Sequence, residues 1–291
     1  MKYIEKHPMM MIVVGILGIS MSAIFVKYST APAAITAAYR MLWTVVLMTP
    51  VVFLKKEARK ELFSINKKQM ILSAFSGIFL AAHFVLWFES LNHTSVASST
   101  TIVCTEVIWV ALGFCLFMKG KLSMKAVFAI AVTFLGSVLI ACADSDTGSL
   151  HLYGDMLALL AAMVEAVYTL IGGVVRKRVS TTVYTYVVYG ACALVLVGTC
   201  FVQREGLMSY GISPVIVGFL LSLFSTILGH SIFSWCLKYF SPSFVSASKL
   251  CEPVVAAIAA GILFGEMPVF LQVIGSSLIL GGVFYYSRIE K

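Results

Sequence analysis

Ionisable side chains occur at a few positions inside otherwise apolar stretches of this chain. They are Arg40, His83, Glu89, Glu106, Glu165, His230, Lys249 and Glu252. A charged group within a lipid bilayer is costly unless it has a partner, a water-filled cavity or a function. Carboxylates in such surroundings can alternate between protonated and ionised forms, so these residues predict proton transfer or the binding of a polar ligand.

Glu106 is the strongest candidate for a carboxylate that changes its charge. Ser99 and Glu106 fall on one mostly polar face of an expected helix, seven residues apart. We expect that face to line a cavity in which Glu106 binds substrate or couples protons. The alternative is that Glu106 only accepts hydrogen bonds from neighbouring hydroxyl groups and joins helices together.

His83 and Trp87 lie four residues apart and share a helix face. An indole beside an imidazole suits an organic or cationic ligand, through stacking and cation–π attraction. Trp87 is as readily explained as an anchor at the membrane interface. His230, which has Thr226 and Ser234 on the same face, is a weaker candidate for the same cavity.

Glu165 is followed at the third position by Tyr168, whose hydroxyl can share its face. Both are candidates for substrate binding or coupling. Arg40 lies well inside an apolar stretch, where it requires a carboxylate or the carbonyl end of a helix as partner. Its guanidinium could also hold a substrate carboxylate.

Lys249, Glu252 and Pro253 occur within five consecutive positions. Lys249 and Glu252, at i and i+3, can neutralise each other, which lowers the cost of keeping both in the membrane. Pro253 removes a backbone hydrogen bond and favours a bend. We therefore predict a structural hinge with an ion pair at this site.

The elements that carry these residues are long and apolar. Of the 291 residues, 60% are hydrophobic and 12% charged, about half the charge of a soluble domain. Such stretches can cross a bilayer only as helices that satisfy their own backbone groups. The sequence predicts an all-α polytopic membrane protein with ten transmembrane helices at 9–27, 34–54, 69–90, 96–117, 125–142, 154–175, 183–202, 214–237, 243–264 and 268–287.

The net charge of +8 is distributed unevenly. With a cytoplasmic N-terminus and ten spans, 17 of the 21 basic residues fall on cytoplasmic segments. This is the asymmetry of the positive-inside rule, so we expect both termini in the cytoplasm, a location in the cell membrane, and no nucleic-acid partner. The seven cysteines form no C-x-x-C pair and no metal-ligand spacing, so we expect neither a metal site nor a cofactor.

The second half of the chain repeats the first. Glu106 and Glu252 are 146 residues apart, and His83 and His230 are 147 apart. Each half, 1–145 and 146–291, contains five expected helices, an odd number, so the two repeats must be inverted relative to each other. Inverted repeats are typical of transporters, in which a site at their interface opens alternately to either side.

Several segments resemble a known family, the EamA type of the drug/metabolite transporter superfamily. They are AAYRMLWTVVLMTP (37–50), EPVVAAIAAGILFGEMP (252–268) and IGSSLILGGV (274–283). The resemblance implies a central cavity lined by helices 1 to 4 and 6 to 9, with helices 5 and 10 at the periphery. The first half departs from the pattern, because Glu106 is followed by valine where Glu252 is followed by Pro253.

These observations predict a secondary transporter that moves a small organic metabolite, such as an amino acid or amine, by alternating access. Export is implied by the resemblance, and proton coupling is left open. If Lys249 neutralises Glu252, the carboxylates of Glu106 and Glu165 remain in the membrane with the single guanidinium of Arg40. This charge balance disfavours polyanions such as nucleotide sugars as substrates. The alternative function, from a different class, is a membrane scaffold or sensor that transports no substrate.

We expect no catalytic residues, because enzyme motifs such as G-x-S-x-G or a P-loop are lacking. The expected partners are a small-molecule substrate and the lipid bilayer, and the sequence fits a monomer as well as a homodimer.

Overall fold

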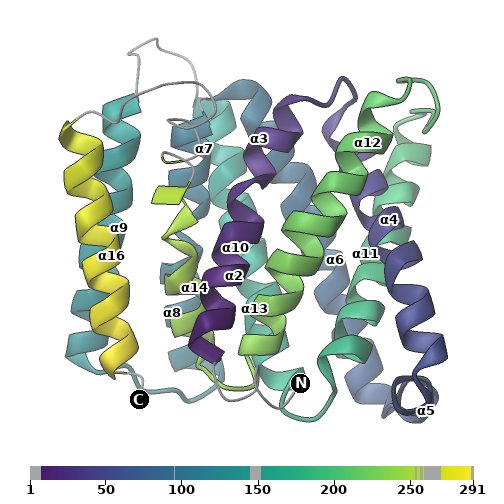
Figure 1. The fold of residues 1–291 in the computed structure, drawn as a ribbon, viewed down its shortest axis with the longest axis horizontal. Helices are drawn as coiled ribbons and strands as arrows, with labels where there is room; N and C mark the ends of the chain where they lie inside the picture. The colour runs from purple at the N-terminus through teal and green to yellow at the C-terminus, as the bar shows by residue number, and fades with distance from the viewer. Residues whose placement is uncertain are drawn as a thin grey trace.

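The computed structural model describes residues 8–94, 96–144, 152–252, 254–255, 258 and 270–289. Regular secondary structure within these ranges is helical, and the helices stand side by side along a common direction (Figure 1). In chain order the elements are α2 (Pro8–Ser20), α3 (Ser22–Lys27), α4 (Ala33–Leu54), α5 (Lys56–Ser64), α6 (Lys67–His93), α7 (Val96–Val103), α8 (Glu106–Phe117), α9 (Met124–Asp144), α10 (Leu152–Val175), α11 (Thr181–Val202), α12 (Ser213–Leu220), the π-helix η1 (Leu221–His230), α13 (Ser231–Cys236), α14 (Pro242–Lys249) and α16 (Phe270–Ile289).

Seven helical segments in the described part of the chain are long and apolar enough to cross a bilayer. They correspond to seven of the expected spans, and three of them are assembled from consecutive elements, α2 with α3, α7 with α8, and α12 with η1 and α13. The spans expected at 125–142 and 268–287 correspond to α9 and α16, which contain shorter apolar segments. The ninth expected span, 243–264, is described at residues 243–252, 254–255 and 258.

The packing of the helices follows the sequence repeat. α2 packs against η1 as α6 packs against α10, and α4 packs against α12 as α6 packs against α11. The equivalent pairs α4 with α11, α8 with α14 and α9 with α16 contact each other directly. This is the pattern that two inverted repeats produce around a pseudo-two-fold axis in the membrane plane. The boundary expected after residue 145 lies outside the described residues.

α9 and α16 form one edge of the bundle, at the left of Figure 1, while α4, α5 and α11 lie at the other edge. This agrees with the peripheral place expected for helices 5 and 10. The helices between the two edges carry His83, Glu106, Glu165, His230 and Lys249, whereas Arg40 is on α4. The placement of these helices brings those five residues together in the interior of the bundle.

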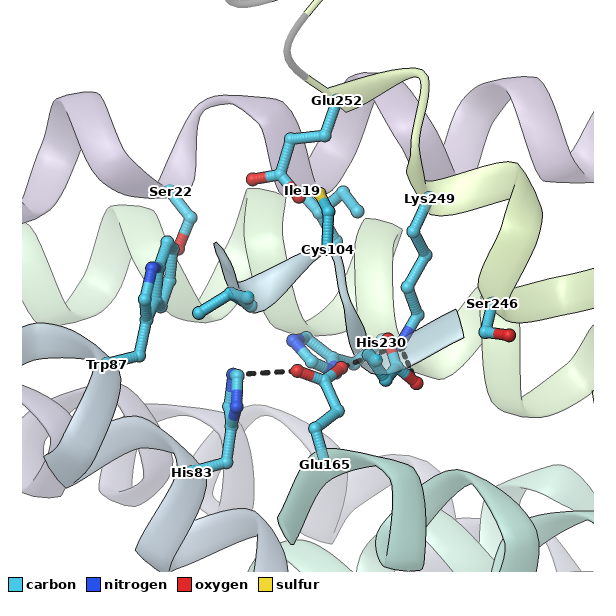
Figure 2. A pocket seen from close by; sticks show the side chains of 12 residues that line it. Ile19, Ser22, His83, Trp87, Cys104, Glu165, His230, Ser246, Lys249 and Glu252 are labelled. Atoms are coloured by element: carbon cyan, nitrogen blue, oxygen red, sulfur yellow. Dashed lines mark hydrogen bonds and ion pairs between the residues drawn. The ribbon is translucent and has the colours of Figure 1, made fainter. Parts of the chain in front are cut away.

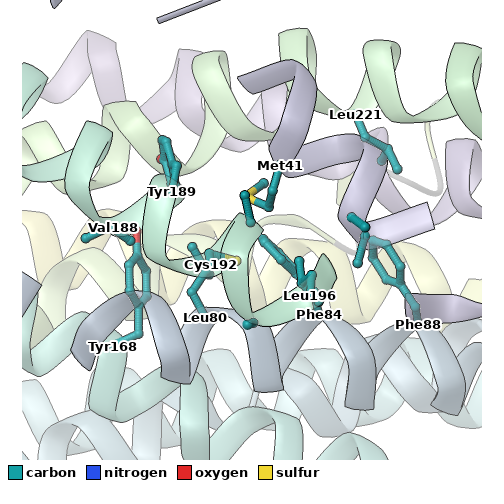
Figure 3. Packing of buried hydrophobic residues seen from close by; sticks show 14 of the residues in the cluster. Met41, Leu80, Phe84, Phe88, Tyr168, Val188, Tyr189, Cys192, Leu196 and Leu221 are labelled. Atoms are coloured by element: carbon teal, nitrogen blue, oxygen red, sulfur yellow. The ribbon is translucent and has the colours of Figure 1, made fainter. Parts of the chain in front are cut away.

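Buried apolar side chains from α4, α6, α10, α11 and η1 form one hydrophobic cluster. Figure 3 shows part of it, with Leu80 and Phe84 on α6 facing Cys192 and Leu196 on α11. A second cluster joins α2, α8, α9, α13, α14 and α16. The site described below is bordered by members of both clusters, such as Trp87 in the first and Ile19 in the second.

Two of the expected helices are interrupted in the membrane. The expected span 96–117 is not one continuous α-helix, because a turn at Cys104 and Thr105 separates α7 from α8. α14 ends in the same way at a turn through Leu250 and Cys251, 146 residues later. At both turns the backbone forms i to i−3 hydrogen bonds, Thr105 N to Ile102 O at 3.0 Å and Cys251 N to Ser248 O at 3.2 Å. Glu106 and Glu252 each follow directly after a turn.

Close contact between α6 and α11 depends on Gly77. A Cβ atom at this position would collide with the backbone oxygen of Val188 and lie 2.8 Å from the Cβ of Ala191. We therefore expect Gly77→Ala to lower the free energy of unfolding by about 1–3 kcal/mol, because the two backbones must move apart. Gly190→Ala on α11 is the control, since a Cβ there meets nothing within 4 Å. Thermal unfolding of the two detergent-purified variants gives their Tm values. An equal Tm for Gly77→Ala and Gly190→Ala would contradict the close packing of α6 on α11.

Candidate functional site

A cavity lies in the interior of the bundle, where helices of both repeats meet (Figure 2). Its volume of about 40 Å³ holds roughly three water molecules. Organic ligands need pockets of several hundred Å³, so the cavity is contracted in this conformation. Its lining residues are Ile19, Ser22, His83, Trp87, Val103, Cys104, Glu106, Glu165, His230, Ser246, Lys249 and Glu252.

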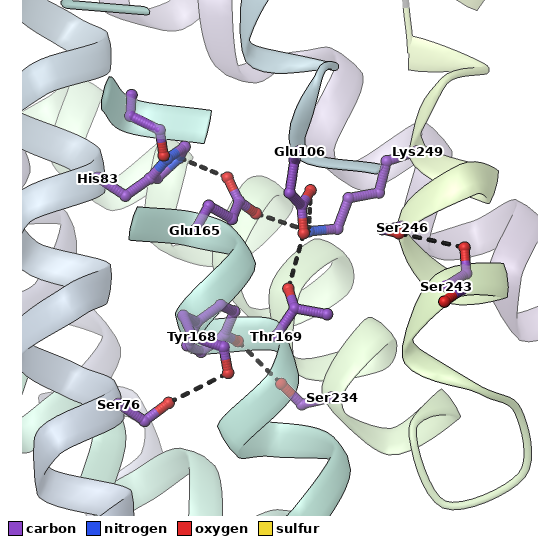
Figure 4. Close-up of polar contacts among 11 residues, drawn as sticks. Ser76, His83, Glu106, Glu165, Tyr168, Thr169, Ser234, Ser243, Ser246 and Lys249 are labelled. Carbon is purple, nitrogen blue, oxygen red and sulfur yellow. Dashed lines mark hydrogen bonds and ion pairs between the residues drawn. The ribbon is translucent and has the colours of Figure 1, made fainter. Parts of the chain in front are cut away.

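Lys249 bridges two carboxylates from different helices. Its Nζ atom lies 2.6 Å from Oε1 of Glu165 on α10 and 3.0 Å from Oε2 of Glu106 on α8. Figure 4 shows the ammonium group between them. All three side chains are at most 10% exposed, so each charge depends on the others for compensation. The bridge also ties α14 to α8 and α10.

His83 shares a proton with Glu165. Its Nδ1 atom lies 3.1 Å from the carbonyl oxygen of Ala161, which can only accept, so Nδ1 carries a hydrogen. Its Nε2 atom lies 2.9 Å from Oε2 of Glu165. Either Nε2 donates as part of an imidazolium, or it accepts from a protonated Glu165. In both cases one dissociable proton lies between the two residues.

Glu106 has two further stabilising interactions. Thr169 on α10 donates a hydrogen bond of 2.8 Å to Oε1 of Glu106. Glu106 is also the first residue of α8, where the positive end of the helix dipole favours an anion. The interruption before α8 thus places the carboxylate at a helix N-terminus in the interior of the bundle.

Glu252 lines the cavity without a partner. No described side chain lies within hydrogen-bonding or ion-pairing distance of its carboxylate. The expected ion pair between Lys249 and Glu252 is therefore wrong for this conformation, because Lys249 extends across the cavity to Glu106 and Glu165. Pro253, the expected hinge residue, lies outside the described residues.

The sequence repeat explains the absence of a partner for Glu252. Lining residues occur as pairs 146 positions apart, namely Ile19 with Glu165, Val103 with Lys249 and Glu106 with Glu252. In one half of the site Glu106 lies beside Lys249, which also contacts the carboxylate of Glu165. In the other half the corresponding positions near Glu252 hold valine and isoleucine, so the charge network is built on one side only.

Trp87 and His230 form the aromatic part of the cavity wall. The Trp87 ring stacks on His83, with centroids 5.9 Å apart and an angle of 20° between the planes. The indole nitrogen of Trp87 and Nδ1 of His230 are buried and have no hydrogen-bond partner among the described residues. An unpaired buried polar atom costs free energy, which a hydrogen bond to a polar ligand or to water would recover.

Arg40 does not line the cavity and does not pair with a carboxylate, contrary to expectation. It is fully buried. Its Nε donates to the Thr226 hydroxyl at 2.8 Å, one terminal nitrogen lies 3.4 Å from the Ser22 hydroxyl, and the guanidinium lies 4.0 Å from the centre of the Phe84 ring. The other terminal nitrogen has no partner among the described atoms. Arg40 therefore lies behind the cavity wall, at the side of Ser22.

Two more candidates lie outside the lining. Ser99 is fully buried and its hydroxyl is 2.5 Å from that of Ser90. The Tyr168 hydroxyl lies 2.9 Å from that of Ser234. Both hydrogen bonds join neighbouring helices.

Sequence reasoning missed Ser22, Cys104 and Ser246 on the cavity wall. The search began from ionisable residues, and small polar side chains in membrane helices are common. Ser246 lies one turn before Lys249, and Cys104 lies in the turn before Glu106, so proximity to those two charges was the available signal. In the described residues no group of three or more His, Cys, Asp or Glu side chains is placed to hold a metal ion.

Comparisons with known proteins place this arrangement among membrane transporters. A sequence model described as the EamA-like transporter family matches residues 7–142 and again residues 152–288. An uncharacterized transporter of Archaeoglobus fulgidus is 25% identical over 257 residues, 85% of each chain. The uncharacterized transporter YyaM of Bacillus subtilis is 25% identical over 262 residues, 88% of this chain and 85% of its own. A solved crystal structure matches with a TM-score of 0.78 and 15% identity over 98% of both chains, which shows the same fold.

Removal of the bridging cation tests the energetics of the site. Lys249→Met leaves two buried carboxylates without their ammonium, and we expect it to lower the free energy of unfolding by about 3–5 kcal/mol. Glu106→Gln in the same chain should restore part of the loss, because one of the two uncompensated charges disappears. Thermal or denaturant unfolding of the single and double variants gives the coupling energy. Additive effects would show that the two residues do not interact.

Proposed function

The chain belongs to the EamA-like transporter family, and we propose that it is a secondary transporter of a small organic metabolite in the cytoplasmic membrane. The observation that carries this proposal is the cavity between the repeats, lined by His83, Glu106, Glu165, Lys249 and Glu252. A site at the interface of inverted repeats can be exposed alternately to either side. The transporter names of the relatives support the same function.

The charges of the cavity favour a substrate with an amino group. Lys249 and the shared proton of His83 compensate Glu106 and Glu165, and the carboxyl group of Glu252 has no partner among the described residues. A protonated amine or the ammonium of an amino acid can pair with this carboxyl group and stabilise its ionised form. Trp87 and His230 offer hydrogen-bonding atoms for a second polar group. A nucleotide-sugar-like anion fits poorly, because the one lysine of the described wall is already engaged.

The link between His83 and Lys249 through Glu165 supports the coupling of transport to protons. When Glu165 is ionised it holds Lys249 at 2.6 Å. Protonation of Glu165 removes half of the charge that holds the ammonium, which is then free to turn toward Glu252, three residues further along its own chain. A change of protonation can thereby release the bridge that joins α14 to α10. We assign Glu165 and His83 to coupling and Glu106 to the fixed end of the bridge.

The orientation in the membrane follows from the basic residues. α2 begins and α16 ends at the lower edge of Figure 1, where α5 also lies. The connections after α8, α10 and α13 reach the same edge and carry Lys119 and Lys121, Arg176 to Arg178, and Lys238. By the positive-inside rule this edge faces the cytoplasm. Export is the direction that the family resemblance favours.

Reconstitution in liposomes tests the proposal. We expect a member of a panel of amino acids, amines and nucleosides to be taken up, and uptake to increase when a pH gradient is imposed. Glu165→Gln should abolish the effect of the gradient while exchange of substrate across the membrane continues, because glutamine cannot release a proton. The same outcome is expected for His83→Gln.

Glu89→Gln is the matched control. Glu89 is 39% exposed at the end of α6, where its partner is His93. This variant should transport like the unmodified protein. A gradient effect that survives in Glu165→Gln would exclude the proposed coupling residue. A panel without any transported member, together with no ligand that raises Tm, would favour a scaffold or sensor.

A further inference from the structure

A second pocket lies on the face of the bundle that carries α5, apart from the central cavity. It has a volume of about 360 Å³ and forms where the end of α5, the start of α6 and the connection between α10 and α11 meet. No residue of its wall also lines the central cavity. The pocket is large enough for a small polar group.

The charges of this pocket favour an anion. Lys68 and Arg178 line it, and no described carboxylate lies within 4.0 Å of either cation. Glu61 is also on the wall, but its Oε1 atom already accepts a hydrogen bond of 2.7 Å from the backbone N–H of Ser180. The pocket wall therefore carries two cations without a salt bridge among the described residues and one carboxylate, which leaves a net positive charge.

The N-terminus of α6 opens into the same pocket. Asn66 caps this helix of 27 residues by accepting from the backbone N–H of Lys68 at 2.8 Å, and both residues line the pocket. The remaining N–H groups of the first turn and the helix dipole attract an anion. The N-terminus of α6 therefore adds to the attraction that Lys68 and Arg178 exert on an anion.

Gln69 points to a ligand that also carries a hydrogen-bond donor. It lines the pocket, its residue is 8% exposed, and its amide oxygen is buried without a partner among the described atoms. An unpaired buried acceptor costs free energy, which a hydroxyl or amino group of a ligand would recover. The complementary ligand thus combines an anionic group with a nearby donor.

The surroundings of the pocket identify the source of such a ligand as the bilayer. Leu54, the last residue of α4, and Phe63, near the end of α5, are 83% and 76% exposed, which suits contact with acyl chains. The same short helix carries Lys56, Arg59 and Lys60. A helix with exposed apolar residues and several cations is typical of a segment that lies in the head-group region of a membrane with anionic lipids.

We propose that this pocket binds the head group of an anionic phospholipid that carries hydroxyl groups, of the phosphatidylglycerol type. Lys68, Arg178 and the N-terminus of α6 hold the phosphate. A glycerol hydroxyl donates to the amide oxygen of Gln69. The bound lipid joins α5 and α6 to the connection between α10 and α11.

Thermal unfolding of the purified full-length protein with short-chain lipids tests the proposal. Dioctanoyl phosphatidylglycerol should raise Tm in a saturable way, and dioctanoyl phosphatidylcholine and inorganic phosphate should not. In the double variant Lys68→Ala with Arg178→Ala the apparent Kd should rise about tenfold or more. Gln69→Glu, which places a carboxylate against the phosphate, should have the same effect and serves if the double variant does not fold.

The double variant Lys121→Ala with Lys125→Ala is the control, because it removes two exposed charges outside the pocket. It should bind the lipid like the unmodified protein. Equal losses in the two double variants would reduce the effect to general surface charge and overturn the proposal. An equal shift with phosphatidylcholine would exclude recognition of the head group. An equal shift with inorganic phosphate would assign the pocket to a soluble anion.

Discussion

The ammonium group of Lys249 is the interaction on which the interior of this protein depends. It lies within 3.2 Å of three carboxylate oxygens, two of Glu106 and one of Glu165. Two carboxylates at this depth would repel each other and lose their hydration without a cation between them. The neighbouring contacts, from His83 to Glu165 and from Thr169 to Glu106, add compensation to the same group. The packing of α8, α10 and α14 around the cavity is therefore inseparable from its charge balance.

This bridge also breaks the symmetry of the two repeats. Glu106 and Glu252 occupy equivalent positions, yet only one half of the site places lysine and a second glutamate nearby, where the other half has Val103 and Ile19. A symmetric pair of bridges would stabilise both halves equally. With a single bridge, one carboxylate is held and the other is free for a ligand. The departure from the repeat thus distinguishes Glu106, which Lys249 holds, from Glu252, which has no partner among the described residues.

Periodicity and charge predicted much of this arrangement. Apolar length predicted the helical bundle, and the search for intramembrane ionisable residues found His83, Glu106, Glu165 and His230 on the cavity wall. The expected ion pair between Lys249 and Glu252 was wrong because spacing along one helix indicates only partners within that helix, and Glu252 is three residues away. The repeat offset is a better guide to the partner of Lys249. The equivalent helices α8 and α14 of the two inverted repeats pack on each other and bring residue 249 beside residue 106. The partners of Arg40 differ from the expected carboxylate or helix carbonyl end, because hydroxyl groups and the Phe84 face compensate it.

The turn between α7 and α8 and the turn after α14 affect both the stability of these helices and their ability to move. A continuous helix through Glu106 would satisfy its backbone internally and present the carboxylate at mid-length, without the favourable helix end. The turn before Glu106 gives up part of the regular hydrogen bonding and in exchange places an anion at an N-terminus. Broken helices also bend more easily than continuous ones. Because the bridge of Lys249 spans these interrupted helices, loss of one ion pair can change their relative positions. In a cavity of about 40 Å³, such a change is required before any metabolite can enter.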